Sequence, residues 1–245
     1  MIKNGGSNMK NSTKKVVVIG GVALMVGATL PQNINAMECT KMDTDIVIRV
    51  GEYPNKPGKR LDNVHEDFDI GVPVRYDNGR YCVQEYDLNY KVANAIVKYL
   101  ESQGVDVVLQ DTQNKSQDLN SAGRRAKSLN PDIYLSIHHN SYQENSSGYF
   151  FMSNVGDTQS SKCAKRLSNA MSSNPMLIPQ MENRSNVNGY IGELNQKPGK
   201  VNILGEFGFF SNPNEVKKCA SDEQVNYIAK QLGDELIKIL KEINN

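Results

Sequence analysis

The sequence predicts a single three-layer α/β domain, in which a mostly parallel, twisted sheet is flanked by helices. Short runs of β-branched and apolar residues alternate along the chain with longer segments whose apolar residues recur at helical spacing. Such alternation favours parallel strands joined by helical connections. No internal repeat and no low-complexity linker divides the chain. Residues 37–245 are long enough for one domain with its own core.

The first 36 residues are predicted to be a secretory signal. Four lysines within the first 15 residues precede an uncharged apolar run over residues 16–30, and the small residue Ala36 follows. This order of regions is typical of a signal peptide. The apolar run is shorter than the roughly 20 residues of a membrane span. We therefore expect a protein that acts outside the cell, in the cell wall or on the outer side of the membrane, with membrane contact only if the segment is retained.

Charge and cysteine usage exclude some classes of function. The formal net charge is +1, and basic residues are not clustered with aromatic ones, so nucleic acid is not an expected partner. The four cysteines of an exported chain allow one or two disulfides, whose pairing the sequence does not define. There is no Cys-x-x-Cys, which argues against a cysteine zinc site.

The first strand is predicted at 46–50, and it carries Glu52 into a loop at its carboxyl end. The segment 53–84 is rich in Gly, Pro, Asp and Asn, contains His65, and is predicted to be a long functional loop. A helix then begins at Glu85 and ends before Gly104. A carboxylate at a helix start is also explained by the helix dipole.

The rest of the chain continues the alternation. We predict strands at 105–109, 133–140, 148–152 and 201–210, helices at 121–129, 161–171 and 221–243, and a polar, substrate-facing loop at 172–188.

Two of the three histidines, His138 and His139, end the predicted strand 133–140. Ligands of α/β domains gather at the carboxyl ends of strands, so a histidine there is well placed to bind a metal ion or substrate. Neighbours on a strand point to opposite faces. We therefore assign His138 to the site and leave His139 out.

Glu206 is the one acid in the apolar strand 201–210. A buried lone carboxylate is costly, so such a residue usually has a metal, a cation or a catalytic role. The structural alternative is an ion pair with an arginine such as Arg124.

These residues together suit a catalytic zinc ion, which typically takes three protein ligands from His, Glu and Asp and keeps one position open. Glu85 and His138 would be ligands, and Glu206 would act as base. No His-Glu-x-x-His helix and no Gly-x-Ser-x-Gly elbow occurs, which disfavours a thermolysin-type site and a serine hydrolase.

From about 46 to 240 the sequence resembles the zinc-dependent N-acetylmuramoyl-L-alanine amidases, type 3 catalytic domain. The motifs are Gln-Glu-Tyr-Asp-Leu-Asn at 84–89, Leu-Ser-Ile-His-His-Asn at 135–140 and Leu-Gly-Glu-Phe-Gly-Phe-Phe-Ser-Asn at 204–212. The resemblance implies a zinc exopeptidase-like fold of the phosphorylase/hydrolase type. It also implies cleavage of the amide between N-acetylmuramic acid and L-alanine in peptidoglycan. Glu85 and His138 would bind Zn²⁺, and Glu206 would assist the water.

The chain departs from the family at its first strand, where the family has Gly-His and this sequence has Gly51-Glu52. Glu52 could bind zinc through oxygen together with Glu85 and His138, in a more anionic site with a weaker Lewis acid. Two alternatives are left open: His65 replaces the missing ligand, or the metal is lost.

Three hypotheses follow. The leading one is a secreted peptidoglycan amidase, and the second is a degenerate, non-catalytic wall-binding or regulatory protein on the same fold. A zinc carboxypeptidase ranks last, because a His-x-x-Glu motif starting at His65 would need glutamate at position 68, where this sequence has phenylalanine. Peptidoglycan is the expected partner, and the sequence leaves open whether a protein partner exists.

Overall fold

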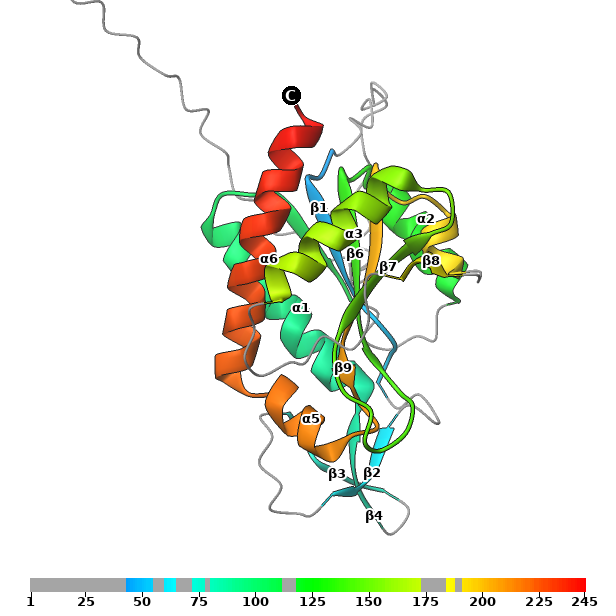
Figure 1. The fold of residues 1–245 in the computed structure, drawn as a ribbon, viewed down its shortest axis with the longest axis vertical. Coiled ribbons are helices and arrows are strands. Elements are labelled where there is room, and N and C mark those ends of the chain that lie inside the picture. Colours follow the sequence, from blue (N-terminus) through cyan, green and yellow to red (C-terminus); the bar gives the residue numbers. More distant parts are fainter. Residues whose placement is uncertain are drawn as a thin grey trace, which may run out of the picture. The chain divides into compact units, whose positions relative to one another are not determined.

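The computed structural model describes residues 43–54, 60–64, 72–77, 80–111, 118–172, 184–187 and 191–245 (Figure 1). All of them belong to one unit, Thr40–Asn245. The predicted signal segment and His65 lie outside these residues. No helix in the described part of the chain is long and apolar enough to cross a membrane.

The central sheet is mostly parallel, as predicted. Neighbouring strands run parallel, except that β7 runs antiparallel to β9. Across the sheet the strands follow in the order β5 (Val107–Gln110), β1 (Ile46–Val50), β6 (Ile133–Asn140), β9 (Val201–Phe209), β7 (Phe150–Asn154) and β8 (Arg184–Val187).

Helices cover both faces of this sheet and complete the three layers. One face packs against α1 (Glu85–Ser102), α3 (Thr158–Met171) and α6 (Asp222–Ile243), and α6 runs beside α1 (Figure 1). The other face packs against α2 (Leu119–Ser128) and α4 (Gly192–Asn195). Each of these helices except α4 was predicted from the sequence.

Strand β6 is buried on both faces, and its alternation decides where each histidine points. Ile133, Leu135 and Ile137 belong to the core shared with α1 and α6, whereas Tyr134 packs in the core on the α2 and α4 side. Side chains alternate along a strand. His138 therefore shares a face with Tyr134, and His139 shares a face with Ile137.

The prediction of one long loop over 53–84 is wrong. Within it lie β2 (Arg60–Val64), β3 (Arg75–Asp77) and β4 (Arg80–Gln84), which form a separate antiparallel sheet in the order β2-β4-β3. These strands are short and mostly polar, so they lack the apolar runs that mark the central strands. The signal that was missed is Asn78-Gly79, a dipeptide typical of hairpin turns.

Two further elements correct the prediction for the carboxyl-terminal half. Strand β8 lies inside the segment predicted as the loop 172–188, because its sequence, Arg-Ser-Asn-Val, is as polar as a loop. Helix α5 (Pro213–Cys219) precedes α6, and the Asn212 side chain caps it by accepting from the backbone N–H groups of Asn214 and Glu215. With β4 and α1, α5 encloses a small apolar cluster of Val83, Leu88, Phe210, Val216 and Ala220.

The sequence allowed one or two disulfides, and the structure does not support two. Cys163 and Cys219 are free and buried, so the chain cannot form two disulfides. Burial raises the pKa of both thiols. Cys39 lies outside the described residues.

Candidate metal centre

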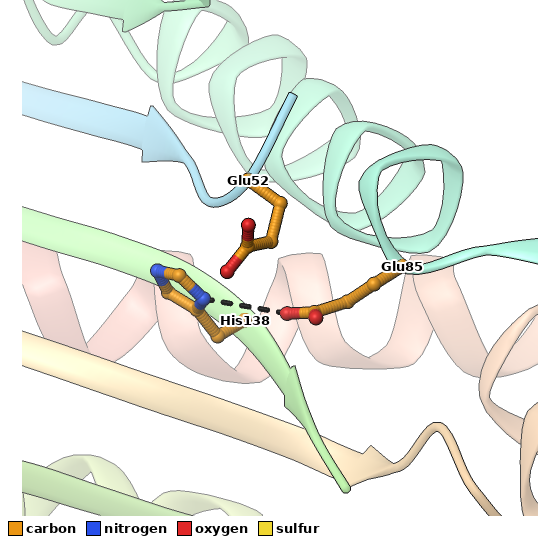
Figure 2. Close-up of side chains that lie close together, drawn as sticks. All are labelled: Glu52, Glu85 and His138. Carbon is orange, nitrogen blue, oxygen red and sulfur yellow. Dashed lines mark hydrogen bonds and ion pairs between the residues drawn. The ribbon is translucent and has the colours of Figure 1, made fainter. Parts of the chain in front are cut away.

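Three side chains from separate elements meet at the carboxyl edge of the central sheet. Glu52 follows β1, Glu85 is the first residue of α1, and His138 lies near the end of β6. One ligand atom of each lies within 4.8 Å of those of the others, and Figure 2 shows both carboxylates turned toward the imidazole. The structure thus brings together the three residues that the sequence analysis named as metal ligands.

The turn after β1 aims Glu52 at this point. Glu52 has a φ of 59°, in the left-handed region that few non-glycine residues adopt. Its neighbour Gly51 donates its N–H to the Ile137 carbonyl at 2.9 Å, which holds the turn against β6. A Cβ at Gly51 would lie 2.5 Å from Cε1 and Nε2 of His138. Glycine is therefore needed here, because the imidazole packs directly on the backbone.

Asn89, one turn into α1, ties the three elements together. Its side-chain N–H₂ donates to the Gly51 carbonyl at 3.0 Å and to Glu85 Oε1 at 3.3 Å. Glu85 Oε1 also accepts from the His139 backbone N–H at 3.3 Å and lies 3.3 Å from His138 Nδ1. Glu85 is 1% exposed, so these contacts fix its carboxylate in a site with little water.

His139 is a structural residue on the opposite face, as predicted. Its Nδ1 donates to Asn89 Oδ1 at 2.8 Å, and its ring lies 6.4 Å from the Phe207 ring. Burial lowers the pKa of His139 to about 4, so the ring is neutral at pH 7.

Glu206 lies beside the three ligand candidates. It is the register partner of His138 across the parallel pair β6 and β9, so the two side chains leave the same face of the sheet. Arg124, the arginine named for the structural alternative, is exposed and donates to Ser121 Oγ at 2.8 Å. Glu206 is half-buried and therefore open to a substrate or a water molecule from one side.

The sequence analysis missed two charged residues behind the site. Arg49 Nη1 lies 2.9 Å from Glu193 Oε2 in an ion pair that is almost completely buried. The Tyr134 hydroxyl donates to the same Glu193 oxygen at 2.9 Å, and Arg49 also donates to Ser136 Oγ at 3.2 Å. Arg49 could have been noticed as a lone charge in an apolar strand. Glu193 could not, because it lies in the four-residue helix α4.

Charges around the imidazole control its protonation. Burial alone would lower the pKa of His138, but the nearby carboxylates of Glu193 and Glu85 raise it to about 10. Burial would raise the pKa of Glu193, but the charge of Arg49 and the contact with His138 lower it to about 2. His138 therefore lies between two carboxylates that both favour positive charge at its position.

The donor set fits a divalent metal ion. Four carboxylates raise the pKa of Arg49, of His138 or of both by their negative charge. They belong to Glu52, Glu85, Glu193 and Glu206. Carboxylates gathered in this way attract a cation. Carboxylate oxygens and imidazole nitrogens are both zinc ligands, and the three side chains here match the number of protein ligands in a catalytic zinc site. The replacement of the expected histidine by Glu52 therefore keeps a chemically suitable ligand at that corner.

The sequence matches a family model described as N-acetylmuramoyl-L-alanine amidase, over residues 61–238. This range contains Glu85, His138 and Glu206, and it begins after Glu52, the point at which the chain departs from the family pattern. Comparison with curated protein sequences gives no match.

Solved amidase structures share the fold. An N-acetylmuramoyl-L-alanine amidase from Clostridium difficile 630 is 18% identical, with a TM-score of 0.62, over 82% of this chain and 98% of its own. AmiC2 of Nostoc punctiforme is 22% identical, with a TM-score of 0.58, over 81% and 97%. CwlD of Clostridioides difficile, solved in complex with the GerS lipoprotein, is 19% identical, with a TM-score of 0.59, over 82% and 100%. With the family model covering most of the chain, this protein belongs to the N-acetylmuramoyl-L-alanine amidases of the Amidase_3 family.

Proposed function

We propose that this amidase cleaves the bond between the lactyl group of N-acetylmuramic acid and L-alanine with the help of a zinc ion held by Glu52, Glu85 and His138. The observation that carries the proposal is the meeting of these three side chains within 4.8 Å, with Glu206 on the neighbouring strand. Membership of the amidase family supports the reaction. The buried O, O, N donor set supports the metal.

Each residue has a distinct task in this reaction. When bound, zinc would polarise the scissile carbonyl and make a water molecule more acidic. Glu206 takes a proton from that water as its oxygen attacks the carbonyl carbon. Glu206 then gives the proton to the nitrogen of L-alanine as the carbon–nitrogen bond breaks. The products are the muramic acid carboxylate and a peptide with a free alanine amino terminus.

Glu52 changes the balance of the site. A second carboxylate ligand donates more negative charge than a neutral imidazole, so the ion would be a weaker Lewis acid. We propose that the chain works with this more anionic site. His65 remains an alternative ligand that lies outside the described residues.

Digestion of purified peptidoglycan tests the proposal. With zinc, the wild-type protein is expected to release new alanine amino termini, detected by dansylation. Glu206→Gln is expected to lower the rate by about 100-fold or more, since it removes the general base, while zinc binding is retained. Glu235→Gln is the matched control, because Glu235 forms an ion pair with Arg166 between α3 and α6. It should react like the wild type.

Binding without cleavage would contradict the proposal. Peptidoglycan binding without alanine release at saturating zinc, unchanged by chelation and by Glu206→Gln, would show a non-catalytic wall-binding protein on the same fold.

We further propose that residues 1–36 direct export and that peptidoglycan is the partner in the cell wall. Mass spectrometry of the protein secreted by a bacterial host tests the export, with a new amino terminus near Met37 as the expected result. The structure of CwlD with a lipoprotein supports asking whether a protein partner binds this chain as well. Co-purification from a cell envelope would test that.

A further inference from the structure

We propose that Glu193 is a positioning residue that determines which ring nitrogen of His138 is available to the metal ion. Arg49 holds Glu193 in place through an ion pair and also competes with it for the same ring nitrogen. This inference rests on the metal site proposed above. It concerns residues behind the site, which the motifs of the sequence do not include.

The two ring nitrogens of His138 face different surroundings. Nδ1 points toward the ligand carboxylates and lies 3.3 Å from Glu85 Oε1, as the dashed line in Figure 2 shows. Nε2 lies on the other side of the ring, 3.2 Å from Arg49 Nη1 and 3.7 Å from Glu193 Oε1. A metal ion among Glu52, Glu85 and His138 would therefore take the lone pair of Nδ1.

Metal binding at Nδ1 places the ring proton on Nε2 and requires an acceptor there. A guanidinium has donors but no acceptor, so Arg49 cannot take this proton. Glu193 Oε1 can: it is buried, it has no hydrogen-bond partner among the described residues, and it lies slightly beyond hydrogen-bond distance. A histidine ligand commonly donates its second N–H to such a carboxylate.

The opposite arrangement also has its partners in place. In a neutral ring whose Nε2 accepts from Arg49, the single ring proton lies on Nδ1 and points at Glu85 Oε1. Loss of the Glu193 carboxylate, which raises the pKa of His138, favours this neutral form. The lone pair that the metal needs is then absent. Glu193 and Arg49 therefore have opposite effects at Nε2. Glu193 favours a proton on Nε2, which leaves Nδ1 for the metal ion, and Arg49 favours a proton on Nδ1, which prevents His138 from acting as a ligand.

Glu193 is held firmly for this task. Its Oε2 is fixed by Arg49 at 2.9 Å and by the Tyr134 hydroxyl at 2.9 Å, which leaves Oε1 directed at the imidazole. Glu193 is 0% exposed and Arg49 is 2% exposed, so water does not replace either partner. Hydrogen bonds in such surroundings orient a ligand strongly.

A purely structural role for the ion pair makes a different prediction. If the pair only stabilises the fold, removal of either partner should weaken metal binding to a similar degree. If the pair sets the ring proton, the two substitutions should act in opposite directions. Glu193→Gln leaves the guanidinium donating to Nε2, whereas Arg49→Met leaves the carboxylate as the acceptor.

Zinc affinity, measured by competition with a chromogenic chelator at one pH, tests this. Glu193→Gln is expected to weaken zinc binding about 10- to 100-fold, the usual effect of losing such a partner. Arg49→Met is expected to bind zinc at least as tightly as the wild type. Glu235→Gln, which breaks an Arg166 ion pair away from the site, is the control and should be unchanged.

Nuclear magnetic resonance of the ring nitrogens shows directly which nitrogen of His138 carries the proton. Nitrogen-15 correlation spectra of the zinc-loaded wild type should show the His138 proton on Nε2, and those of metal-free Glu193→Gln should show it on Nδ1. Only three histidines need assignment, and His65→Gln and His139→Asn identify the other two. Thermal unfolding checks that each variant folds.

The outcomes separate this proposal from the metal site itself. Wild-type zinc affinity in folded Glu193→Gln, loss of affinity in both single variants, or zinc on Nε2 would overturn the role of Glu193 alone. Absence of zinc from the wild-type site would overturn the metal site and this proposal together. If Glu193→Gln does not fold, the same change in the Arg49→Met background repeats the test without an unpaired guanidinium, and it should still weaken zinc binding.

Discussion

At the scale of single residues, Glu52 sets the chemical character of the site. Its left-handed backbone conformation turns the carboxylate back toward His138, and Gly51 leaves room for the imidazole beside it. Histidine is among the residues that tolerate such a conformation best, after glycine and with asparagine and aspartate. The position therefore accepts the ligand that the family normally has there.

Glu52→His tests the contribution of this ligand. We expect zinc affinity to rise, because an imidazole is a good zinc ligand and one negative charge leaves the site, while Glu52→Ala lowers it. Chelator competition measures both. Equal affinities in the wild type and Glu52→Ala would remove Glu52 from the ligand set and would favour His65 in its place.

The sequence made part of the site predictable. Glu206 was found because a lone carboxylate interrupts an apolar strand, and His138 because it ends one. Glu193 could not be found, since a polar residue in a short helix between loops breaks no pattern. Its function arises only when folding places α4 against the face of β6 that carries Tyr134 and His138.

At the scale of elements, long apolar patterns were predicted well and short polar strands were not. β1, β6 and β9 are apolar runs because both faces of the sheet are covered, and α1 and α6 show a helical period because one side of each is buried. The strands of the small sheet are stabilised by one another and by the cluster around Val83, so their own sequences carry little signal. Pro213 after the capping residue Asn212 was a helix start that the sequence did show.

The contact between α1 and α6 gives a prediction in which packing opposes helix propensity. A Cβ on Gly233 of α6 would lie 2.3 Å from Cδ1 of Tyr99 on α1. Gly233→Ala should therefore destabilise the wild type by about 1 to 3 kcal/mol, although alanine is the better helix former by about 1 kcal/mol. In a Tyr99→Ala background the same change should stabilise the protein.

Urea unfolding of the wild type, of Gly233→Ala, of Tyr99→Ala and of the double variant gives the coupling free energy between the two positions. The same sign for Gly233→Ala in both backgrounds would show that the helices do not meet at this point.

At the scale of the whole molecule, the metal site joins elements that are far apart in the sequence. β1, α1 and β6 each supply one ligand candidate, and Asn89 and Glu85 link their ends by hydrogen bonds. An ion bound there would therefore stabilise the native state and not the unfolded chain.

Thermal unfolding with zinc and with a chelator measures this effect. At a free zinc concentration of 100 times the dissociation constant, the stabilisation should be about 2.7 kcal/mol, and the melting temperature should rise. His138→Ala should abolish the rise. A rise of the same size in His138→Ala would place the bound zinc elsewhere on the chain.

Anomalous X-ray scattering from crystals of the zinc-loaded protein, recorded on both sides of the zinc absorption edge, tests the central claim most directly. The account predicts one strong peak in contact with Glu52, Glu85 and His138 Nδ1, on the side of the ring away from Glu193. A zinc-loaded crystal without a peak among these three residues, or with the ion bound through His65 in place of Glu52, would contradict it.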